Sequence, residues 1–223
     1  MSKSNKNDIN NIIDMELEDY YTKEHNLYYI TKKDKENIIN SLLYKNVDLI
    51  LDTIIDKFNY KNTKNIINKD DINYFENILK NCKDIINNKT KDGDTLLHNM
   101  VFFGCYDMVY LLIKYGAKID IVDTDNQIPL HRSIFLSDLN VFDLLIKNSF
   151  NLKKELNHQD KDGNTVLHLA IIIKNYMIIK NLLKNGADPY ILNNANIIPI
   201  DLAKDKNKKF DENIIKIFKK YIN

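Results

Sequence analysis

Cysteine, glycine, proline and tryptophan are scarce in this chain of 223 residues, and each scarcity argues against a class of protein. The two cysteines, Cys82 and Cys105, stand outside any CxxC or Cys/His cluster. This excludes a disulfide framework and argues against a structural zinc site, so a reducing compartment fits best. Five glycines, three prolines and no tryptophan disfavour a turn-rich all-β fold.

An excess of either charge and a long apolar run are also missing. The chain has 32 Lys and Arg residues against 31 Asp and Glu residues, so it has no general attraction to nucleic acid or to an anionic membrane. The longest apolar run, Leu169–Ile173, is too short to cross a bilayer, and the polar start Met1–Asn11 has no signal-peptide core. We expect a soluble intracellular protein, cytoplasmic or nuclear, with no nucleic acid and no membrane among its partners.

Asparagine, isoleucine, lysine, aspartate and tyrosine, in contrast, are used heavily throughout the chain. This bias is typical of a strongly AT-rich genome, as in some large DNA viruses, protozoa and intracellular bacteria. It concerns the origin of the chain and does not bear on its mechanism.

A short motif recurs along the second half of the chain. It reads Asp-Gly-Asp-Thr-Leu-Leu-His in 92–98, Asp-Asn-Gln-Ile-Pro-Leu-His in 125–131 and Asp-Gly-Asn-Thr-Val-Leu-His in 162–168. The histidines are 33 and 37 residues apart, and Asp201 stands in the histidine's place another 33 residues on. The four extra residues of the longer step are expected in Asn151–Leu156.

These motifs resemble the D-x-x-G-x-T-P-L-H-x-A opening of ankyrin repeats, whose period is about 33 residues. Residues 108–117 and 178–189 resemble the second helix and closing loop of that family. The resemblance implies an all-α ankyrin-repeat solenoid of stacked helix-turn-helix units with short β-hairpin turns. We divide the chain into an N-terminal segment 1–31 with a disordered start and a capping helix, degenerate repeats 32–90, clear repeats 91–194 and a C-terminal capping repeat 195–223.

Several motif positions have a physical reason. Thr95 and Thr165 can cap the first helix of a repeat by accepting a backbone N–H. Pro129 and Pro199 fit the first helical position, where a missing N–H costs nothing. Ile128 and Ile198 replace the threonine in the second and fourth copies, so we expect those helix starts to be less well satisfied.

Three histidines, His98, His131 and His168, suggest a metal or catalytic set, but the repeat explains them better. The resemblance implies that each one hydrogen-bonds turn backbone and stabilises the stack. Copies in successive layers lie about 10 Å apart, which is too far to share a zinc ion that needs its nitrogens at about 2 Å. The sequence has no phosphate-binding glycine loop and no G-x-S-x-G elbow. We therefore expect no catalysis, no cofactor and no metal.

The resemblance also implies that a partner binds the concave face, which hairpin tips and first helices form. The tips are Lys91, Asp92, Asp94, Thr124, Asp125, Gln127, Lys161, Asp162, Asn164, Asn194 and Ile197. Six first-helix positions that the family commonly makes polar are apolar here: Phe102, Phe103, Phe135, Leu136, Ile172 and Ile173. They predict an apolar strip along the groove, which is typical of an interaction site. Two alternatives remain: one residue of each pair turns inward, or the N-terminal segment folds over the strip.

The leading functional hypothesis is a non-catalytic adaptor or inhibitor, monomeric in isolation, that captures a protein partner through the concave face. Given the composition, that partner is expected to be a host regulatory protein. The alternative is a structural component that self-assembles through the same strip. An enzyme hidden in 1–88 has little space, and the lysine-rich tail is interpreted as a solvated cap.

Overall fold

The computed structural model describes residues 72–73, 75–76, 79–80, 86–136, 139–205 and 207–222. The predictions for the N-terminal segment 1–31, and most of those for the degenerate repeats 32–90, lie outside these residues. The alternative in which the N-terminal segment covers the strip lies outside them too.

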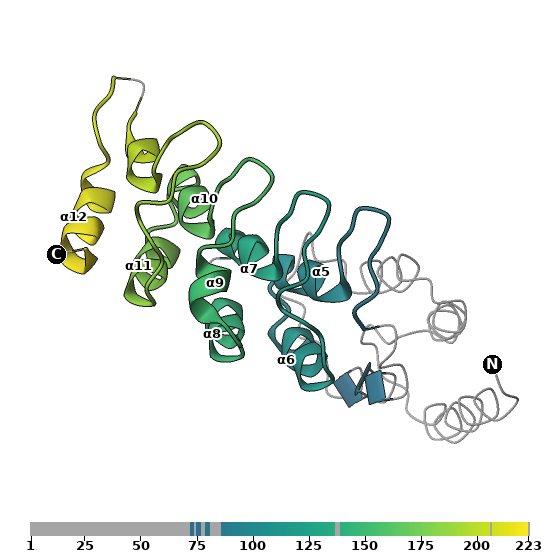
Figure 1. The fold of residues 1–223 in the computed structure, drawn as a ribbon. Coiled ribbons are helices and arrows are strands. Elements are labelled where there is room, and N and C mark those ends of the chain that lie inside the picture. Colours follow the sequence, from purple (N-terminus) through teal and green to yellow (C-terminus); the bar gives the residue numbers. More distant parts are fainter. Residues whose placement is uncertain are drawn as a thin grey trace, which may run out of the picture.

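The described helices come in pairs, each preceded by a hairpin turn (Figure 1). The pairs are α5 (Leu96–Phe102) with α6 (Tyr106–Lys114) in the first repeat, α7 (Pro129–Arg132) and its 3-10 continuation η1 (Ser133–Phe135) with α8 (Asn140–Lys147) in the second, and α10 (Val166–Ile172) with α11 (Tyr176–Lys184) in the third. The last unit holds the 3-10 helix η2 (Pro199–Ala203) and α12 (Glu212–Tyr221).

One short helix falls outside this pairing. It is α9 (Leu152–Leu156), which lies within the range expected for the four extra residues of the second repeat. Asn151 precedes it as the N-cap, and its side chain accepts a hydrogen bond from the Lys154 N–H at 3.2 Å.

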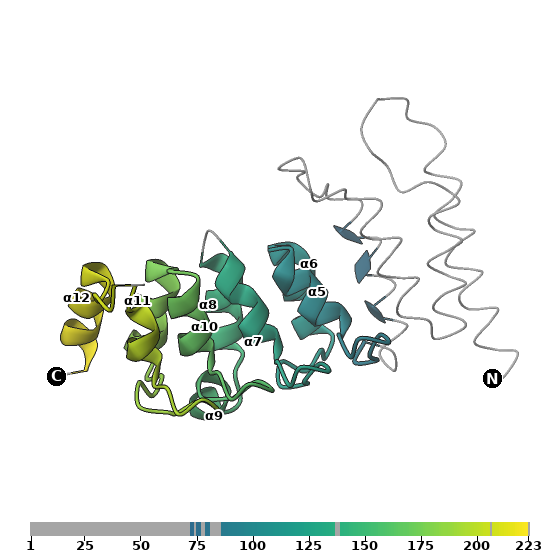
Figure 2. The same ribbon diagram turned by 90° about the horizontal axis from the view of Figure 1, so that it is seen from above.

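The first helices form one layer and the second helices another, with the hairpins projecting on one side (Figures 1 and 2). Antiparallel bridges between Lys89 and Thr95 and between Gln159 and Thr165 close the hairpins of the first and third repeats. This arrangement confirms the all-α solenoid with short hairpin turns.

A single core runs between the two layers. In α5 the buried residues Leu97 and Met100 follow helical spacing, and in α6 Met108 and Leu112 do the same from the opposite side. Because no repeat can bury its apolar face alone, each pair of helices depends on its neighbours in the stack for stability.

A helical segment before the first repeat contributes to the same core. Phe75 and Leu79 are buried, and Glu76 lies on the side of α6. The Glu76 carboxylate is 2.6 Å from Lys114 Nζ and accepts a hydrogen bond from the Tyr115 hydroxyl at 2.7 Å. The residues described between 72 and 80 therefore pack against the first clear repeat, as the next layer of the stack would.

The opposite end of the described stack is an amphipathic helix. Ile214 and Phe218 of α12 are buried, whereas its three lysines, Lys216, Lys219 and Lys220, are exposed. Asp211 caps the helix by accepting hydrogen bonds from the two backbone N–H groups of Asn213 and Ile214. No helix among the described residues combines the length and the apolar character that spanning a membrane requires.

Backbone hydrogen bonds join each hairpin to the next, and we call this series the hairpin ladder. In every case an N–H near the start of one tip donates to a carbonyl of the preceding tip. The bonds are Thr124 N to Asp92 O at 3.3 Å, Lys161 N to Asp125 O at 2.8 Å, and Asn194 N to Asp162 O at 3.0 Å. The ladder satisfies backbone groups that stacking removes from water, and it fixes the register of the hairpins.

Candidate functional site

The histidine of the first repeat fixes both the start of α5 and its contact with the next repeat. Thr95 is the N-cap residue, and its backbone N–H donates to Nδ1 of His98 at 3.1 Å, with the threonine hydroxyl 2.9 Å from the same nitrogen. Since a backbone N–H can only donate, Nδ1 is the acceptor and the ring proton lies on Nε2. Nε2 then donates to the Gln127 carbonyl at 3.1 Å. One neutral imidazole thus links a helix cap to the neighbouring hairpin.

This arrangement returns in the third repeat but not in the second. His168 accepts the Thr165 N–H at 3.1 Å and donates to the Ile197 carbonyl at 3.0 Å. His131 accepts the Ile128 N–H at a longer 3.3 Å, and its buried Nε2 has no hydrogen-bond partner among the described residues. The helix start at Ile128 is therefore less satisfied than those at Thr95 and Thr165, as the sequence indicated.

Burial lowers the pKa of all three histidines, and that of His131 falls to about 4. The His158 ring, 5.8 Å away edge-on, lowers the His131 pKa further. The unfolded chain therefore takes up this proton first, near pH 6.5, and the folded state takes it up only near pH 4. Stability contributed by the neutral ring is fully present above pH 6.5 and is lost as the pH falls toward 4.

We expect the free energy of unfolding to drop by about 3 kcal/mol through His131 alone between neutral pH and about pH 4. Urea unfolding at several pH values measures this dependence. His131→Leu should flatten most of it, and His168→Leu serves as the matched change at a histidine with both hydrogen bonds. An unchanged slope in the His131 variant would contradict the prediction.

A second feature of every described hairpin after the first is an acidic or amide side chain that closes the turn; in the first hairpin the Thr90 hydroxyl stands in this place and accepts the Asp92 N–H at 3.3 Å. Oδ1 of Asp123 accepts the N–H groups of Asp125 at 2.8 Å and of Gln127 at 2.9 Å. The same two bonds are formed, at corresponding positions, by Asp160, Asn193 and Asp205. This position was not predicted from the sequence, although Asp123, Asp160 and Asn193 recur with the same steps as the histidine motif.

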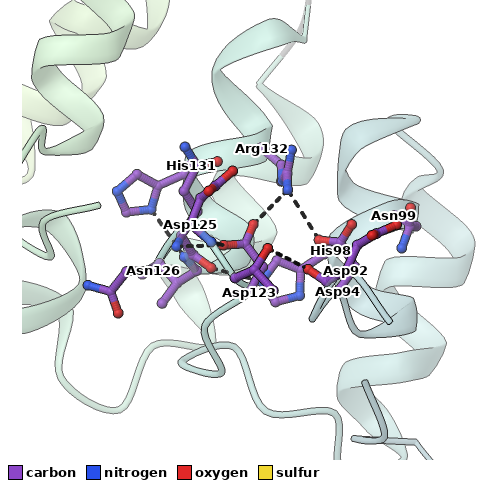
Figure 3. A network of polar contacts seen from close by, with 12 residues as sticks. Asp92, Asp94, His98, Asn99, Asp123, Asp125, Asn126, His131 and Arg132 are labelled. Carbon is purple, nitrogen blue, oxygen red and sulfur yellow. Dashed lines mark hydrogen bonds and ion pairs between the residues drawn. The ribbon is translucent and has the colours of Figure 1, made fainter. Parts of the chain in front are cut away.

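Arg132 joins two hairpins through a shared ion pair (Figure 3). Its Nη2 lies 2.6 Å from Asp123 and 3.2 Å from Asp94, and the Asp123 side chain is almost fully buried. Asp94, His98 and Asp123 bring three potential metal ligands within 4.8 Å of one another. Both carboxylates contact the guanidinium, however, and both imidazole nitrogens are hydrogen-bonded. This cluster is therefore an internal ion-pair network between the first two repeats.

The apolar strip is described for both residues of each predicted pair. Phe102 and Phe135 are 47% and 58% exposed, and their rings meet edge-on with centroids 6.1 Å apart. The second member of each pair, Phe103 or Leu136, is half-buried against the core. In these two repeats, therefore, one residue of each pair turns inward, as one of the two alternatives predicted.

The third repeat differs because both of its predicted residues are exposed. Ile172 is 52% exposed and Ile173 is 39% exposed. Tyr106 and Tyr176, the first residues of α6 and α11, add exposed aromatic surface just beyond the strip. From here on, the strip means Phe102, Phe135, Ile172 and Ile173.

The predicted tips divide into exposed residues and residues that hold the stack together. The exposed tips are Lys91, Asp92, Thr124, Asp125, Lys161, Asp162 and Asn194. Asp94, Gln127, Asn164 and Ile197 are half-buried. Asp94 pairs with Arg132, and Asn164 accepts a hydrogen bond from the Asn193 side chain at 2.9 Å. Burial raises the Asp94 pKa and Arg132 opposes that rise, so this carboxylate is already committed to an internal contact.

Comparison with known proteins gives one consistent result. A family model described as ankyrin repeats, in three copies, matches residues 27–155 and 97–193. The chain is 30% identical over 190 residues to an ankyrin repeat protein of Acanthamoeba polyphaga mimivirus, covering 78% of this chain and 23% of that protein. It is 32% identical over 116 residues to the B-cell lymphoma 3 protein homolog of Mus musculus, covering 52% of this chain and 25% of the mouse protein.

A third relative is named as a cation channel protein. The homolog of transient receptor potential cation channel subfamily A member 1 in Caenorhabditis elegans is 32% identical over 124 residues, covering 56% of this chain and 10% of the channel protein. The chain thus spans a quarter or less of the length of these three relatives. What they share with it is the repeat scaffold.

Proposed function

The chain belongs to the ankyrin-repeat family, and from that premise we propose that it is a non-catalytic module that binds a protein partner through the strip on its concave face. Ankyrin repeats are generally protein–protein interaction modules. The observation that supports this site is the exposure of Phe102, Phe135 and Ile172 at corresponding positions of three successive repeats. Apolar side chains in such a row contribute binding free energy once a partner removes them from water.

The strip also has the composition of an effective binding centre. Full burial of a phenylalanine or isoleucine side chain is worth about 1.5–3 kcal/mol, so covering the exposed parts of four such residues supports a stable complex. Aromatic residues at the centre of a surface are favoured anchors, and Phe102 and Phe135 already hold each other in place. The charged tips, among them Lys91, Asp125 and Lys161, would steer the partner and select among partners.

We propose an adaptor or inhibitor, because a module of this kind acts by occupying a surface of its partner or by bringing two proteins together. The amino-acid bias, which is typical of an AT-rich genome, and the similarity to a mimivirus protein favour a source that lives inside host cells. A host regulatory protein is accordingly the partner that we propose. The name of the mouse relative specifies no partner for this chain.

Affinity capture tests the site with a charge-matched control. The native chain and Phe102→Asp/Phe135→Asp/Ile172→Asp are each used to capture proteins from host-cell lysate. The control, Tyr110→Asp/Phe150→Asp/Leu192→Asp, adds the same charge at exposed apolar residues outside the strip. Circular dichroism verifies that all three proteins are folded. We expect the strip variant to lose at least about 90% of the captured partner, which corresponds to a loss of 1.4 kcal/mol or more.

Capture of the same partner by all three proteins would move the binding site away from the strip. Self-assembly, the competing function, predicts a molar mass that rises with concentration for the native chain and stays at the monomer value for the strip variant. Light scattering across a concentration series distinguishes the two functions, because an adaptor or inhibitor remains monomeric in isolation.

A further inference from the structure

The helix layers are packed unevenly along the stack, and the junction between the second and third repeats is the loosest of the three that the structure describes. In the layer of second helices, α8 packs against α6 and α11 packs extensively against α12, but α8 and α11 have little packing between them. In the layer of first helices, α10 packs less with α7 and η1 than α5 does with the same two elements. The first helix of the second repeat also changes from α to 3-10 geometry after Arg132, although α7 and η1 together span the same seven positions as α5 and α10.

Two polar contacts change at the same junction. His98 and His168 each donate a well-formed hydrogen bond to the next hairpin, whereas Nε2 of His131 makes none of that geometry and interacts only weakly with the His158 backbone. The hairpin position that is glycine in the first and third repeats is Asn126 in the second, with φ +58°. A Cβ at Gly93 or Gly163 would overlap the next hairpin, whereas Asn126 is accommodated at this junction with the ladder bond at 2.8 Å.

The hairpin side of this junction nevertheless remains connected. Lys161 N–H donates to Asp125 O at 2.8 Å, and Asn126 Nδ2 donates to Gln159 O at 2.7 Å. Nε2 of His158 lies 2.8 Å from the Asn126 carbonyl. The hairpin side of this junction is thus tied by hydrogen bonds, whereas its helices approach one another less closely than those of the flanking junctions do.

We propose that the stack bends between its second and third repeats, with the hairpin ladder as the pivot and the second helices α8 and α11 as the side that opens. Phe102 and Phe135 lie on one side of this hinge, and Ile172 and Ile173 lie on the other. Bending therefore changes the separation of the two halves of the strip without disturbing the Phe102–Phe135 contact, and it lets the concave face adapt to the curvature of what it binds. The hinge does not depend on which partner occupies the strip.

Distances between spin labels test the hinge directly. Lys114, Lys147 and Lys184 are the exposed last residues of α6, α8 and α11, and each is changed to cysteine in pairs on the full chain carrying Cys82→Ser. Cys105 is buried and is not expected to react. Pulsed electron paramagnetic resonance then compares the pair 147/184 with the pair 114/147. We expect the distance distribution of 147/184 to be at least about twofold broader. Equal widths, or a narrower 147/184 distribution, would overturn the proposal.

A second variant acts on the junction itself. Asn175 donates from Nδ2 to the carbonyls of Ile134 at 2.8 Å and Leu136 at 3.2 Å, while its Oδ1 caps α11 by accepting the Ile178 N–H. Asn175→Asp keeps that cap and sets a carboxylate against two carbonyl oxygens of the second repeat. It should broaden the 147/184 distribution further and leave 114/147 unchanged.

The matched control is Asn181→Asp, because the Asn181 Nδ2 donates within its own helix, to the Met177 carbonyl at 2.9 Å. This variant makes the same chemical change in α11 without altering a hydrogen bond that crosses the junction, and it should leave both distributions as they are. If Asn175→Asp broadens both pairs alike, or neither of them, the flexibility does not reside at this junction and the hinge is wrong.

Discussion

Replacing Gly163 with alanine is expected to lower the free energy of unfolding by about 3 kcal/mol or more, because two costs coincide there. The residue has φ +76°, a conformation that costs an alanine about 1 kcal/mol. The added Cβ would also lie 2.6 Å from the backbone nitrogen of Asn194. That nitrogen is fixed by its ladder bond to Asp162 O, so the two hairpins would have to separate.

Gly186→Ala separates the two costs. Gly186 has φ +89°, but a Cβ there meets nothing within 4 Å, so only the cost of about 1 kcal/mol is expected. Urea unfolding followed by far-UV circular dichroism measures both variants against the native chain. Similar losses at the two glycines would show that the hairpins do not approach as closely as the structure places them.

The two glycines show which structural features could be predicted from the sequence and which could not. The motif period located the hairpin turns, and the single-residue register of the motif located the helix starts at Thr95, Pro129 and Thr165. Those features depend on neighbours in the sequence, which a periodic pattern reports directly. Whether a turn glycine also faces another backbone depends on the next repeat, and the sequence pattern does not distinguish Gly163 from Gly186 in that respect.

The strip was also predicted from the register of the repeats, and that register left the orientation of some of its residues open. Apolar residues at one register of three repeats indicated exposed surface, and Phe102, Phe135 and Ile172 are indeed exposed. Their neighbours Phe103 and Leu136 are half-buried against the core, whereas Ile173, which also directly follows its helix, is exposed. Helical periodicity no longer applies beyond a helix end, so the orientation of these neighbours was left open.

Arg132 was missed because its partners lie in other segments of the chain. Asp94 is 38 residues earlier and Asp123 is in the preceding turn, so no local pattern joins the three. One signal was present: Arg132 is the only arginine in a chain that otherwise uses lysine for positive charge. Arginine offers several donors in a planar fork, and lysine cannot replace it readily where one cation serves two carboxylates.

Arg132→Met is therefore expected to destabilise the protein by about 3–5 kcal/mol, the usual cost of leaving a buried charge without its partner. Methionine keeps much of the length and the apolar stem of arginine, so the change removes mainly the charge and the donors. Asp123, whose side chain is 1% exposed, would then be left as an uncompensated carboxylate between the first and second repeats. Arg132→Lys should be intermediate, because one ammonium group reaches the two carboxylates less well. Urea unfolding again supplies the free energies.

The double variant Arg132→Met/Asp123→Asn decides whether buried charge is the cause. An asparagine keeps the turn, because Asn193 in a later hairpin accepts the N–H groups of Ala195 and Ile197 at 3.0 Å, as Asp123 does with its own turn. It carries no charge that needs a cation, and Asp94 remains partly exposed to water. Stability within about 1 kcal/mol of the native chain is expected for the double variant. If the second substitution restores no stability, the destabilisation in Arg132→Met comes from lost packing of the arginine stem. The ion pair then contributes little to the stability of the interface between the two repeats.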